Sequence, residues 1–508
     1  MKDHVTRRDF LKVAGLLPLS FVMPPSIGSS HTAQQSQQNV IVIVFDALSA
    51  RHISLYGYRR DTMPNLSKLA DRAIVYHNHY AGGNFTTPGT ASLLTGVHPW
   101  KHRAFENLGT VDEAFLNKNI FSAFPDYRRI TFTHNLWASA ILHQFTQNVE
   151  LYIPANELLL TDDYFIPELF RNDEDVARLS WTRAIKKEEE GYAYSLFLSH
   201  LYERVRDWPL EKLRSEYPRG LPMVFEDNYF LLEQSIDRVA AELKRTGQPF
   251  LGYFHFWPPH DPYCTPREFY GRFINDGLKF IQKPRSIFST TTETVEELDQ
   301  YRIAYDESIL YVDREFGRLV DYLEKSGSLA NTWLVLTSDH GEMFDRGING
   351  HTTPVLYEPI VRVPLLIFEP GRESREDIYQ LTSAVDLLPT LLHVTGHIQA
   401  DWTEGVVLPP FNHEFPQNRN IFVLEAKENE KDKPITIGTT AIISDRFKLT
   451  NFFGYEVLGG INGELIELYD LENDPEELNN LYSTKDKIGS ELLNELKVKL
   501  KLMNEPYL

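Results

Sequence analysis

Residues 332–341 read TWLVLTSDHG, in which a short apolar run ends abruptly in a polar cluster. Two other runs have the same form: VIVIVF at residues 40–45 ends at Asp46, and FLGYFHF at residues 250–256 leads to a cluster that ends at His260. Continuous apolar runs of this length are typical of strands that are buried on both faces, as in a parallel sheet. The three runs therefore predict inner strands of one sheet.

A helical pattern precedes the third run. Apolar side chains recur at helical spacing, and Gly327 is placed to end the helix. These apolar positions are Ile309, Val312, Phe316, Leu319 and Leu323. The alternation of helix and strand predicts a doubly wound, mostly parallel α/β sheet with helices on both faces. In such sheets ligands collect at the carboxyl ends of the strands, where all three polar clusters fall.

Two regions do not follow this alternation of helix and strand. Residues 147–222 are rich in charged and aromatic side chains, which predicts a mainly helical insertion that overhangs the site. Beyond about residue 396 the buried-strand character is lost, and an acidic, leucine-bearing helix is expected over about residues 485–503. The sequence thus indicates a catalytic domain over residues 38–396 and a smaller carboxyl-terminal α+β subdomain over residues 397–508.

The chain is acidic, with 71 Asp and Glu against 51 Lys and Arg, a formal net charge of −20. Such a field repels nucleic acid and anionic lipid, so no nucleic-acid partner is expected. If the substrate is itself anionic, a local positive centre must overcome the overall field. A bound metal ion is the usual device.

The first 33 residues resemble a twin-arginine signal peptide, with Arg7 and Arg8 followed by a modest apolar run. That run is too short to span a bilayer, and no later segment is long enough to do so. We therefore expect the twin-arginine translocase to be a partner during export, and the mature protein to be extracytoplasmic, either periplasmic or secreted. The single cysteine, Cys264, allows no internal disulfide.

A segment rich in hydroxyl groups, NFTTPGTASLLTG at residues 84–96, places two threonines just before Pro88, which can open a helix. The amino terminus of a helix suits an anion such as phosphate. Asp46, Asp339 and His340 come from two strand ends and together could hold a divalent ion. Such an ion would lower the pKa of a nearby hydroxyl and neutralise an ester oxygen.

Several blocks of the sequence occur in the order of a known family. They are residues 39–69, 92–96, 255–263, 338–341, 350–364, 386–391 and 467–477. Together they resemble the sulfatase family of the alkaline phosphatase superfamily, over nearly the whole of the expected mature chain. The resemblance implies an alkaline phosphatase-like fold and a hydrolase that acts on ester bonds.

The resemblance also implies roles for individual residues. Asp46, Thr86, Asp339 and His340 match metal ligands, for one or two divalent ions per chain. Zinc or manganese is favoured because an imidazole joins the carboxylates, with calcium or magnesium as alternatives. Two further histidines, His260 and His351, match catalytic positions that contact the ester oxygens or, in two-metal relatives, a second ion. His255 and Asp261 are weaker candidates, and His134 matches a substrate motif poorly.

Two departures from the family pattern decide the expected chemistry. True sulfatases carry a cysteine or serine that is oxidised to formylglycine, whereas this chain has Thr86, followed by Thr87 as its nearest rival. Threonine cannot form that aldehyde, so Thr86 is expected to be the nucleophile itself, as in phosphodiesterase relatives. The family's second aspartate after the first strand is replaced by Ala47.

The leading hypothesis is therefore a metal-dependent hydrolase that cleaves a phosphate mono- or diester through Thr86. The substrate is expected to be a small anionic ester, or a lipid or glycan head group. Three alternatives stay open at this point: a sulfuric ester hydrolase that works without formylglycine, a phospho-group transferase, and an inactive member that binds an anionic ligand.

The export prediction can be tested directly. Replacing Arg7→Lys and Arg8→Lys together should leave the precursor in the cytoplasm, because the translocase reads the arginine pair. Immunoblots of cell fractions measure this, with Lys2→Gln as the control that should still be exported. Unchanged export of the double variant would mean that another route is used.

Overall fold

The structure is a computed structural model that describes residues 37–160, 208, 210–224, 228–416, 418–483 and 486–508. The expected signal peptide and most of the expected helical insertion, residues 161–207 and 209, lie outside the described residues.

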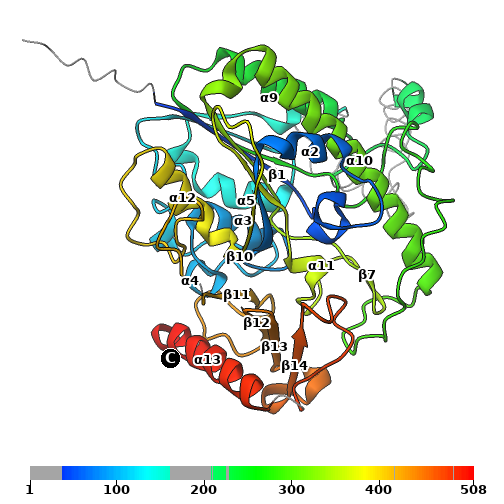
Figure 1. Ribbon diagram of the computed structural model, residues 1–508, viewed down its shortest axis with the longest axis vertical. Coiled ribbons are helices and arrows are strands. Elements are labelled where there is room, and N and C mark those ends of the chain that lie inside the picture. The colour runs from blue at the N-terminus through cyan, green and yellow to red at the C-terminus, as the bar shows by residue number, and fades with distance from the viewer. Residues whose placement is uncertain (1–36, 161–207, 209, 225–227, 417, 484–485) are drawn as a thin grey trace, which may run out of the picture. The chain divides into compact units, whose positions relative to one another are not determined.

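An eight-stranded sheet organises the chain (Figure 1), with the strand order β10-β2-β9-β6-β1-β5-β3-β4. The strands are β1 Asn39–Phe45, β2 Ile74–Tyr80, β3 Arg128–Thr133, β4 Leu151–Tyr152, β5 Phe250–Phe256, β6 Thr332–Thr337, β9 Leu365–Phe368 and β10 Glu376–Ser383. β1 lies between β5 and β6 and is parallel to both. β9 alone of these strands runs antiparallel to its neighbours, β2 and β6. The three apolar runs thus form three adjacent central strands, and every residue of each is buried.

Helices cover both faces of this sheet, as predicted. One face packs against α2 Pro64–Leu69, α9 Leu232–Arg245 and α10 Val295–Lys325. The other packs against α3 Thr86–Thr95, α5 Leu136–Gln144 and α12 Leu387–Val394. All five apolar positions predicted for the long helix α10 are buried, and Gly327 beyond its end has a left-handed φ of 73°.

The carboxyl-terminal region forms a four-stranded antiparallel sheet backed by one helix (Figure 1). Its elements are β11 Asn420–Glu425, β12 Gly438–Ser444, β13 Phe447–Phe453, β14 Glu464–Asp470 and α13 Asp486–Asn504. The expectation that buried strands end near residue 396 was wrong, because all but the last residue of β12 and of β13 is buried. These strands alternate apolar side chains with Thr, Asn and Lys, so that no continuous apolar run marks them.

A buried ion pair network ties this second sheet to the loops of the first. Lys448 of β13 places its Nζ 3.2 Å from Glu358 Oε1 and 2.9 Å from Glu477 Oε1. Glu358 begins the short helix α11, Glu358–Val361, which follows the segment that carries His351. Three further short elements are α4 Pro99–His102, β7 Phe344–Asp345 and β8 Ile348–Asn349. The carboxyl-terminal sheet therefore anchors a loop at the carboxyl ends of the main strands.

The close approach of α3 to the end of β6 requires glycine at position 89. A Cβ atom at Gly89 would lie 2.2 Å from the backbone oxygen of Asp339, which follows β6. Only a residue without a side chain lets the helix approach the strand end this closely.

We therefore expect Gly89→Ala to lower the free energy of unfolding by about 2 kcal/mol and to displace α3, because overpacking forces the backbone to move. Thermal and urea unfolding measure the loss. Gly247→Ala is the matched control, since its Cβ would meet only the flexible guanidinium of Arg128, at 3.1 Å. Equal stability of the two variants would contradict the close approach.

Candidate active site

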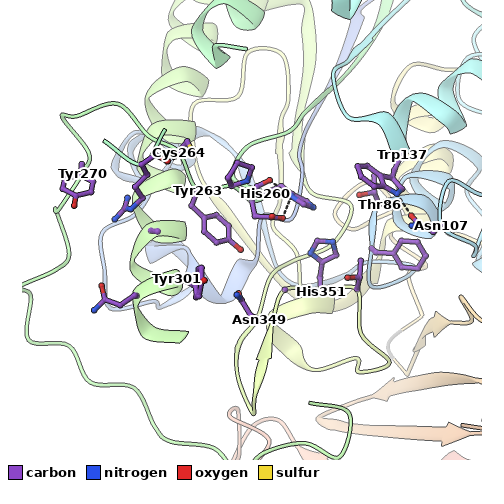
Figure 2. A pocket seen from close by; sticks show the side chains of 18 of the residues that line it. Thr86, Asn107, Trp137, His260, Tyr263, Cys264, Tyr270, Tyr301, Asn349 and His351 are labelled. Carbon is purple, nitrogen blue, oxygen red and sulfur yellow. Dashed lines mark hydrogen bonds and ion pairs between the residues drawn. The ribbon is translucent and has the colours of Figure 1, made fainter. Parts of the chain in front are cut away.

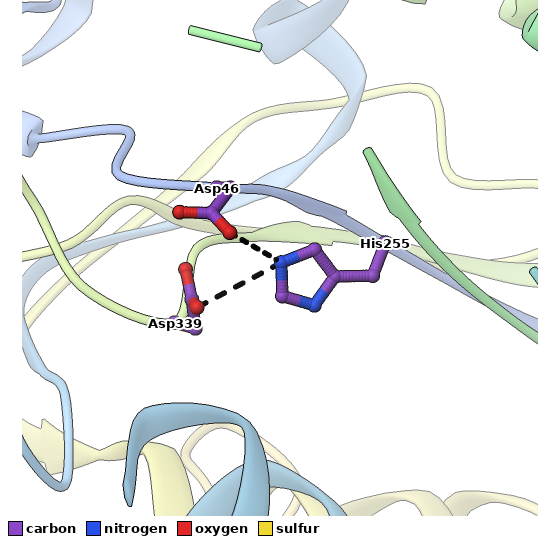
Figure 3. A group of neighbouring side chains, drawn as sticks. All are labelled: Asp46, His255 and Asp339. Atoms are coloured by element: carbon purple, nitrogen blue, oxygen red, sulfur yellow. Dashed lines mark hydrogen bonds and ion pairs between the residues drawn. The ribbon is translucent and has the colours of Figure 1, made fainter. Parts of the chain in front are cut away.

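Side chains from three strand ends converge on one buried point (Figure 3). Asp46 directly follows β1, Asp339 follows β6, and His255 lies one residue before the end of β5. His255 Nε2 is 3.1 Å from Asp46 Oδ2 and 3.7 Å from Asp339 Oδ2. All three residues are fully buried. Parallel strands in this order bring their carboxyl ends together, which is why distant parts of the sequence meet here.

Thr86 is the first residue of α3 and points its hydroxyl at this cluster. Its Oγ1 donates to Asp46 Oδ2 at 3.4 Å and lies 3.4 Å from His340 Nε2. The helix begins two residues before Pro88, whose missing N–H costs nothing because the first turn leaves these groups unpaired. Thr87 differs, because its buried hydroxyl has no hydrogen-bond partner among the described residues.

Three histidine rings lie side by side next to Thr86. The centroids of His340 and His351 are 4.2 Å apart, and those of His351 and His260 are 4.9 Å apart. Glu342 orients His351, with Oε1 2.9 Å from Nδ1, while Asp261 Oδ1 lies 2.8 Å from His260 Nδ1. The structure thus brings the six predicted site residues together around one point.

Thr86, His260 and His351 also line a cavity of about 830 Å³ (Figure 2). A cavity of this size is typical of a small-molecule site and is much larger than a phosphate or sulfate group.

Sequence reasoning underrated His255 and missed Asn135 and Glu342. Asn135, which caps α5, donates from Nδ2 to Asp46 Oδ2 and reaches Thr86 Oγ1 at 3.5 Å. Asn135 follows the short strand β3, which pairs with β5, and this pairing brings it to the cluster. His134 has a structural contact, because its Nε2 accepts the backbone N–H of Trp257 at 3.2 Å.

The two aspartates differ in their proton affinity. Burial acts to raise the pKa of Asp46, but the hydrogen bond to His255 and the charges of His260 and His340 hold it well below its ordinary value. Burial and the charge of Asp46 raise the pKa of Asp339. Two carboxylates side by side in a buried site repel each other and require a nearby positive charge.

The three neighbouring histidines also differ in their pKa values. Burial acts against the charged form of His260, yet the carboxylate of Asp261 raises its pKa to about 10. His340 has its pKa raised to about 9, because Asp339 and Asp46 outweigh its burial. Burial lowers the pKa of His351 despite the charge of Glu342. Without a bound metal ion, the surroundings therefore favour the charged form of His260 and His340 and the neutral form of His351.

The donor set fits a divalent metal ion. One ligand atom each from Asp46, His255 and Asp339 lie within 4.8 Å of one another. No hydrogen-bond donor among the described residues reaches the buried Asp46 Oδ1, and His340 Nε2 lies 3.3 Å from it. The Nδ1 of His340 binds Gly341 O at 3.0 Å, which leaves Nε2 directed at the carboxylates. Two carboxylates and an imidazole are ligands typical of a zinc or manganese site.

Ala47, which replaces the family's second aspartate, has a left-handed backbone with φ 60°. Tyr305 of α10 stabilises this turn, since its hydroxyl donates to Ala47 O at 2.5 Å and accepts the N–H of Ser49 at 2.9 Å. The Ala47 N–H itself donates to Asp339 Oδ1 at 3.4 Å. The turn after β1 is thus coupled to the second carboxylate.

None of the helices in the described part of the chain is both long and apolar enough to cross a membrane.

Two family models match this chain, and two known proteins each align with most of it. The family model described as Sulfatase matches residues 38–137 and 143–397, and the model for the N-sulphoglucosamine sulphohydrolase C-terminal region matches residues 351–505. Choline-sulfatase of Rhizobium meliloti is 26% identical over 475 residues, covering 87% of this chain and 82% of that protein. The multifunctional alkaline phosphatase superfamily protein PehA of Trinickia caryophylli is 24% identical over 511 residues, covering 88% and 91%.

A solved structure shares the fold. The phosphonate monoester hydrolase of Agrobacterium radiobacter superposes with a TM-score of 0.65 at 19% identity, covering 91% of this chain and 96% of that one. The expected alkaline phosphatase-like architecture is therefore confirmed.

The cluster of carboxylates and imidazoles generates a prediction on metal content. The purified protein should contain zinc or manganese, and Asp339→Asn should reduce its metal affinity by about 100-fold, because a charged ligand is lost. Elemental analysis after dialysis measures this without reference to activity. Asp377→Asn is the control, since Asp377 is a partly exposed carboxylate that pairs with Arg375. Equal metal content in all three proteins would overturn the assignment.

Proposed function

We propose that this chain, which belongs to the sulfatase family, is a metal-dependent hydrolase that cleaves a phosphate mono- or diester with Thr86 as the nucleophile. One observation carries the proposal: the Thr86 hydroxyl lies 3.4 Å from both Asp46 Oδ2 and His340 Nε2, at the amino terminus of α3. A buried threonine has no other chemical route to a covalent intermediate than attack by its own oxygen.

Asp46, Asp339 and His340, with His255 beside them, are the residues that would hold the ion. A divalent ion bound there supplies positive charge that lowers the pKa of the Thr86 hydroxyl and offsets the charge of the ester oxygens. The amino terminus of α3, where Thr86 lies, favours an anion.

The proton transfers of the two steps then fall to His260 and water. The Thr86 hydroxyl proton passes to water as Oγ1 attacks phosphorus and the ester bond breaks, while Asp46 Oδ2 accepts the hydrogen bond that orients the hydroxyl. The Asp261 carboxylate favours the charged form of His260, which can protonate the leaving alcohol. In the second step the neutral His260 accepts a proton from the water that attacks phosphorus, and Thr86 Oγ1 leaves and regains a proton from water. Asn135 donates a hydrogen bond to Asp46 and lies near Thr86, so it fixes the position of the Asp46 carboxylate relative to the Thr86 hydroxyl.

A second candidate, hydrolysis of a sulfate ester, is favoured by the relatives, since several carry sulfatase in their names. The same residues would bind a sulfate ester, because its oxygens present similar geometry and charge. The absence of a cysteine or serine at position 86 argues for phosphate, since the family's aldehyde cannot form from threonine.

Variants at position 86 test whether Thr86 is the nucleophile, and their substrates distinguish phosphate ester from sulfate ester hydrolysis. We expect Thr86→Ala to reduce turnover of 4-nitrophenyl phosphate and bis(4-nitrophenyl) phosphate by about 1,000-fold or more, as removal of a nucleophile does. Thr86→Ser should retain part of the rate because a hydroxyl remains. Thr87→Val is the matched control and should stay active, because the Thr87 hydroxyl makes no hydrogen bond with the described residues.

The same three proteins should be assayed with 4-nitrophenyl sulfate, and phosphothreonine should be sought by mass spectrometry of acid-quenched enzyme. Phosphate esters are expected to react much faster than sulfate esters. A fully active Thr86→Ala variant would exclude Thr86 as the nucleophile. Faster turnover of the sulfate ester would exclude phosphate esters as the preferred substrates but would leave the role of Thr86 in place.

A further inference from the structure

The cavity extends well beyond the reacting residues. Figure 2 shows Thr86, His351 and Trp137 at one end and Tyr270, Cys264 and Tyr301 at the other. A phosphate group at Thr86 fills only a small part of about 830 Å³. The remaining volume is therefore available to the rest of the substrate.

Aromatic side chains dominate the walls of this volume, and neutral amides accompany them. The aromatic lining residues are Phe85, Trp137, Tyr263, Tyr270 and Tyr301, and the amides are Asn107, Gln300 and Asn349. Tyr270, Ile274 and Tyr301 all line the cavity and are 45%, 44% and 40% exposed. An exposed apolar rim around a cavity is typical of a binding surface.

The aromatic wall near Thr86 is held in place before any ligand binds. Trp137 Nε1 donates to Asn107 Oδ1, and the indole packs against Trp257 with ring centroids 5.9 Å apart. Trp257 in turn lies 4.2 Å from the ring of His260. A ring that enters here meets a fixed surface, which reduces the entropy lost on binding.

Positive charge is scarce in the outer part of the cavity. Among the lining residues that the structure describes, Arg219 is the only lysine or arginine. Its Nη1 is 2.7 Å from Glu307 Oε2, and its guanidinium stacks over Tyr270 at 4.7 Å. Glu307 is buried, so this pair is neutral as a unit. The side chain of Asp261 is 63% exposed and pairs with His260 at 2.8 Å.

We propose that the alcohol part of the substrate is an uncharged group with a flat apolar ring face, and that Trp137 selects this ring, with Tyr270 and Tyr301 lining the space beyond it. This rests on the proposed function only for the position of the reacting ester at Thr86. Aromatic side chains stack on such a face, and the amides bind its polar edge. Among the described lining residues a second anion on the alcohol part would meet no unpaired lysine or arginine, in a chain of net charge −20.

The test compares esters of primary alcohols, so that the basicity of the leaving group stays similar. Benzyl phosphate and glucose 6-phosphate present an aromatic and a sugar ring, ethyl phosphate presents no ring, and 3-carboxybenzyl phosphate adds one anion to the first. We expect kcat/KM for benzyl phosphate, glucose 6-phosphate or both to exceed that for ethyl phosphate by about 10-fold or more. The carboxylate should reduce the benzyl value by about 10-fold.

Trp137→Ala should reduce the ratio of the ring ester to ethyl phosphate by about 10-fold, mainly through KM, because Trp137 lies at the Thr86 end of the cavity and stacking on an aromatic ring contributes about one decade of affinity. Trp137→Phe should restore most of the ratio. Tyr379→Ala is the control, since Tyr379 is 65% exposed on β10 and does not line the cavity.

Binding measured by calorimetry on Thr86→Ala protein, with both the phosphates and the matching sulfates, separates this inference from the proposed function. If ring esters bind more tightly than ethyl esters among the sulfates but not among the phosphates, the proposed ring-binding role of the cavity is supported. The proposal that the enzyme cleaves phosphate esters is then rejected. Equal affinity for the ring and ethyl esters, or tighter binding of the carboxylated ester, would overturn the inference.

Discussion

The structure depends on holding two ionisable carboxyl groups, Asp46 and Asp339, side by side in a fully buried place. Their mutual repulsion is offset only because imidazoles from β5 and from the loop after β6 reach the same point. Each of these side chains sits at a strand end, so the register of β1, β5 and β6 sets every distance in the cluster. The parallel sheet serves as a frame that places charge where water is excluded.

The second sheet contributes to the same arrangement from outside. Lys448 lies fully buried and pairs with both Glu358 and Glu477, which fixes α11 and the loop that carries His351. Removing one member of a buried ion group leaves an uncompensated charge, which costs about 3–5 kcal/mol. The carboxyl-terminal region therefore stabilises the geometry of the cavity, although it supplies none of the described residues that line it.

The central strands and the meeting of Asp46 with Asp339 and His340 could be predicted because buried parallel strands have a continuous apolar pattern, and polar side chains at their ends stand out. The expected positions of His260 and His351 came from the family resemblance. The pattern does not mark β12 and β13, where Thr450 and Lys448 alternate with apolar neighbours. His255 escaped emphasis because it lies inside an apolar run, where a histidine is more often structural. Asn135 required knowledge that β3 lies next to β5, which is a property of the fold and not of the local sequence.

The turn after β1 has a consequence for how this site could change over evolutionary time. Alanine at φ 60° bears a backbone penalty that asparagine or aspartate bears less, because their short polar side chains favour the left-handed region. Position 47 thus has a main-chain conformation that aspartate adopts more readily than alanine, and Tyr305 holds it. The backbone would not oppose an Ala47→Asp substitution, which would add a third carboxyl group beside Asp46 and Asp339.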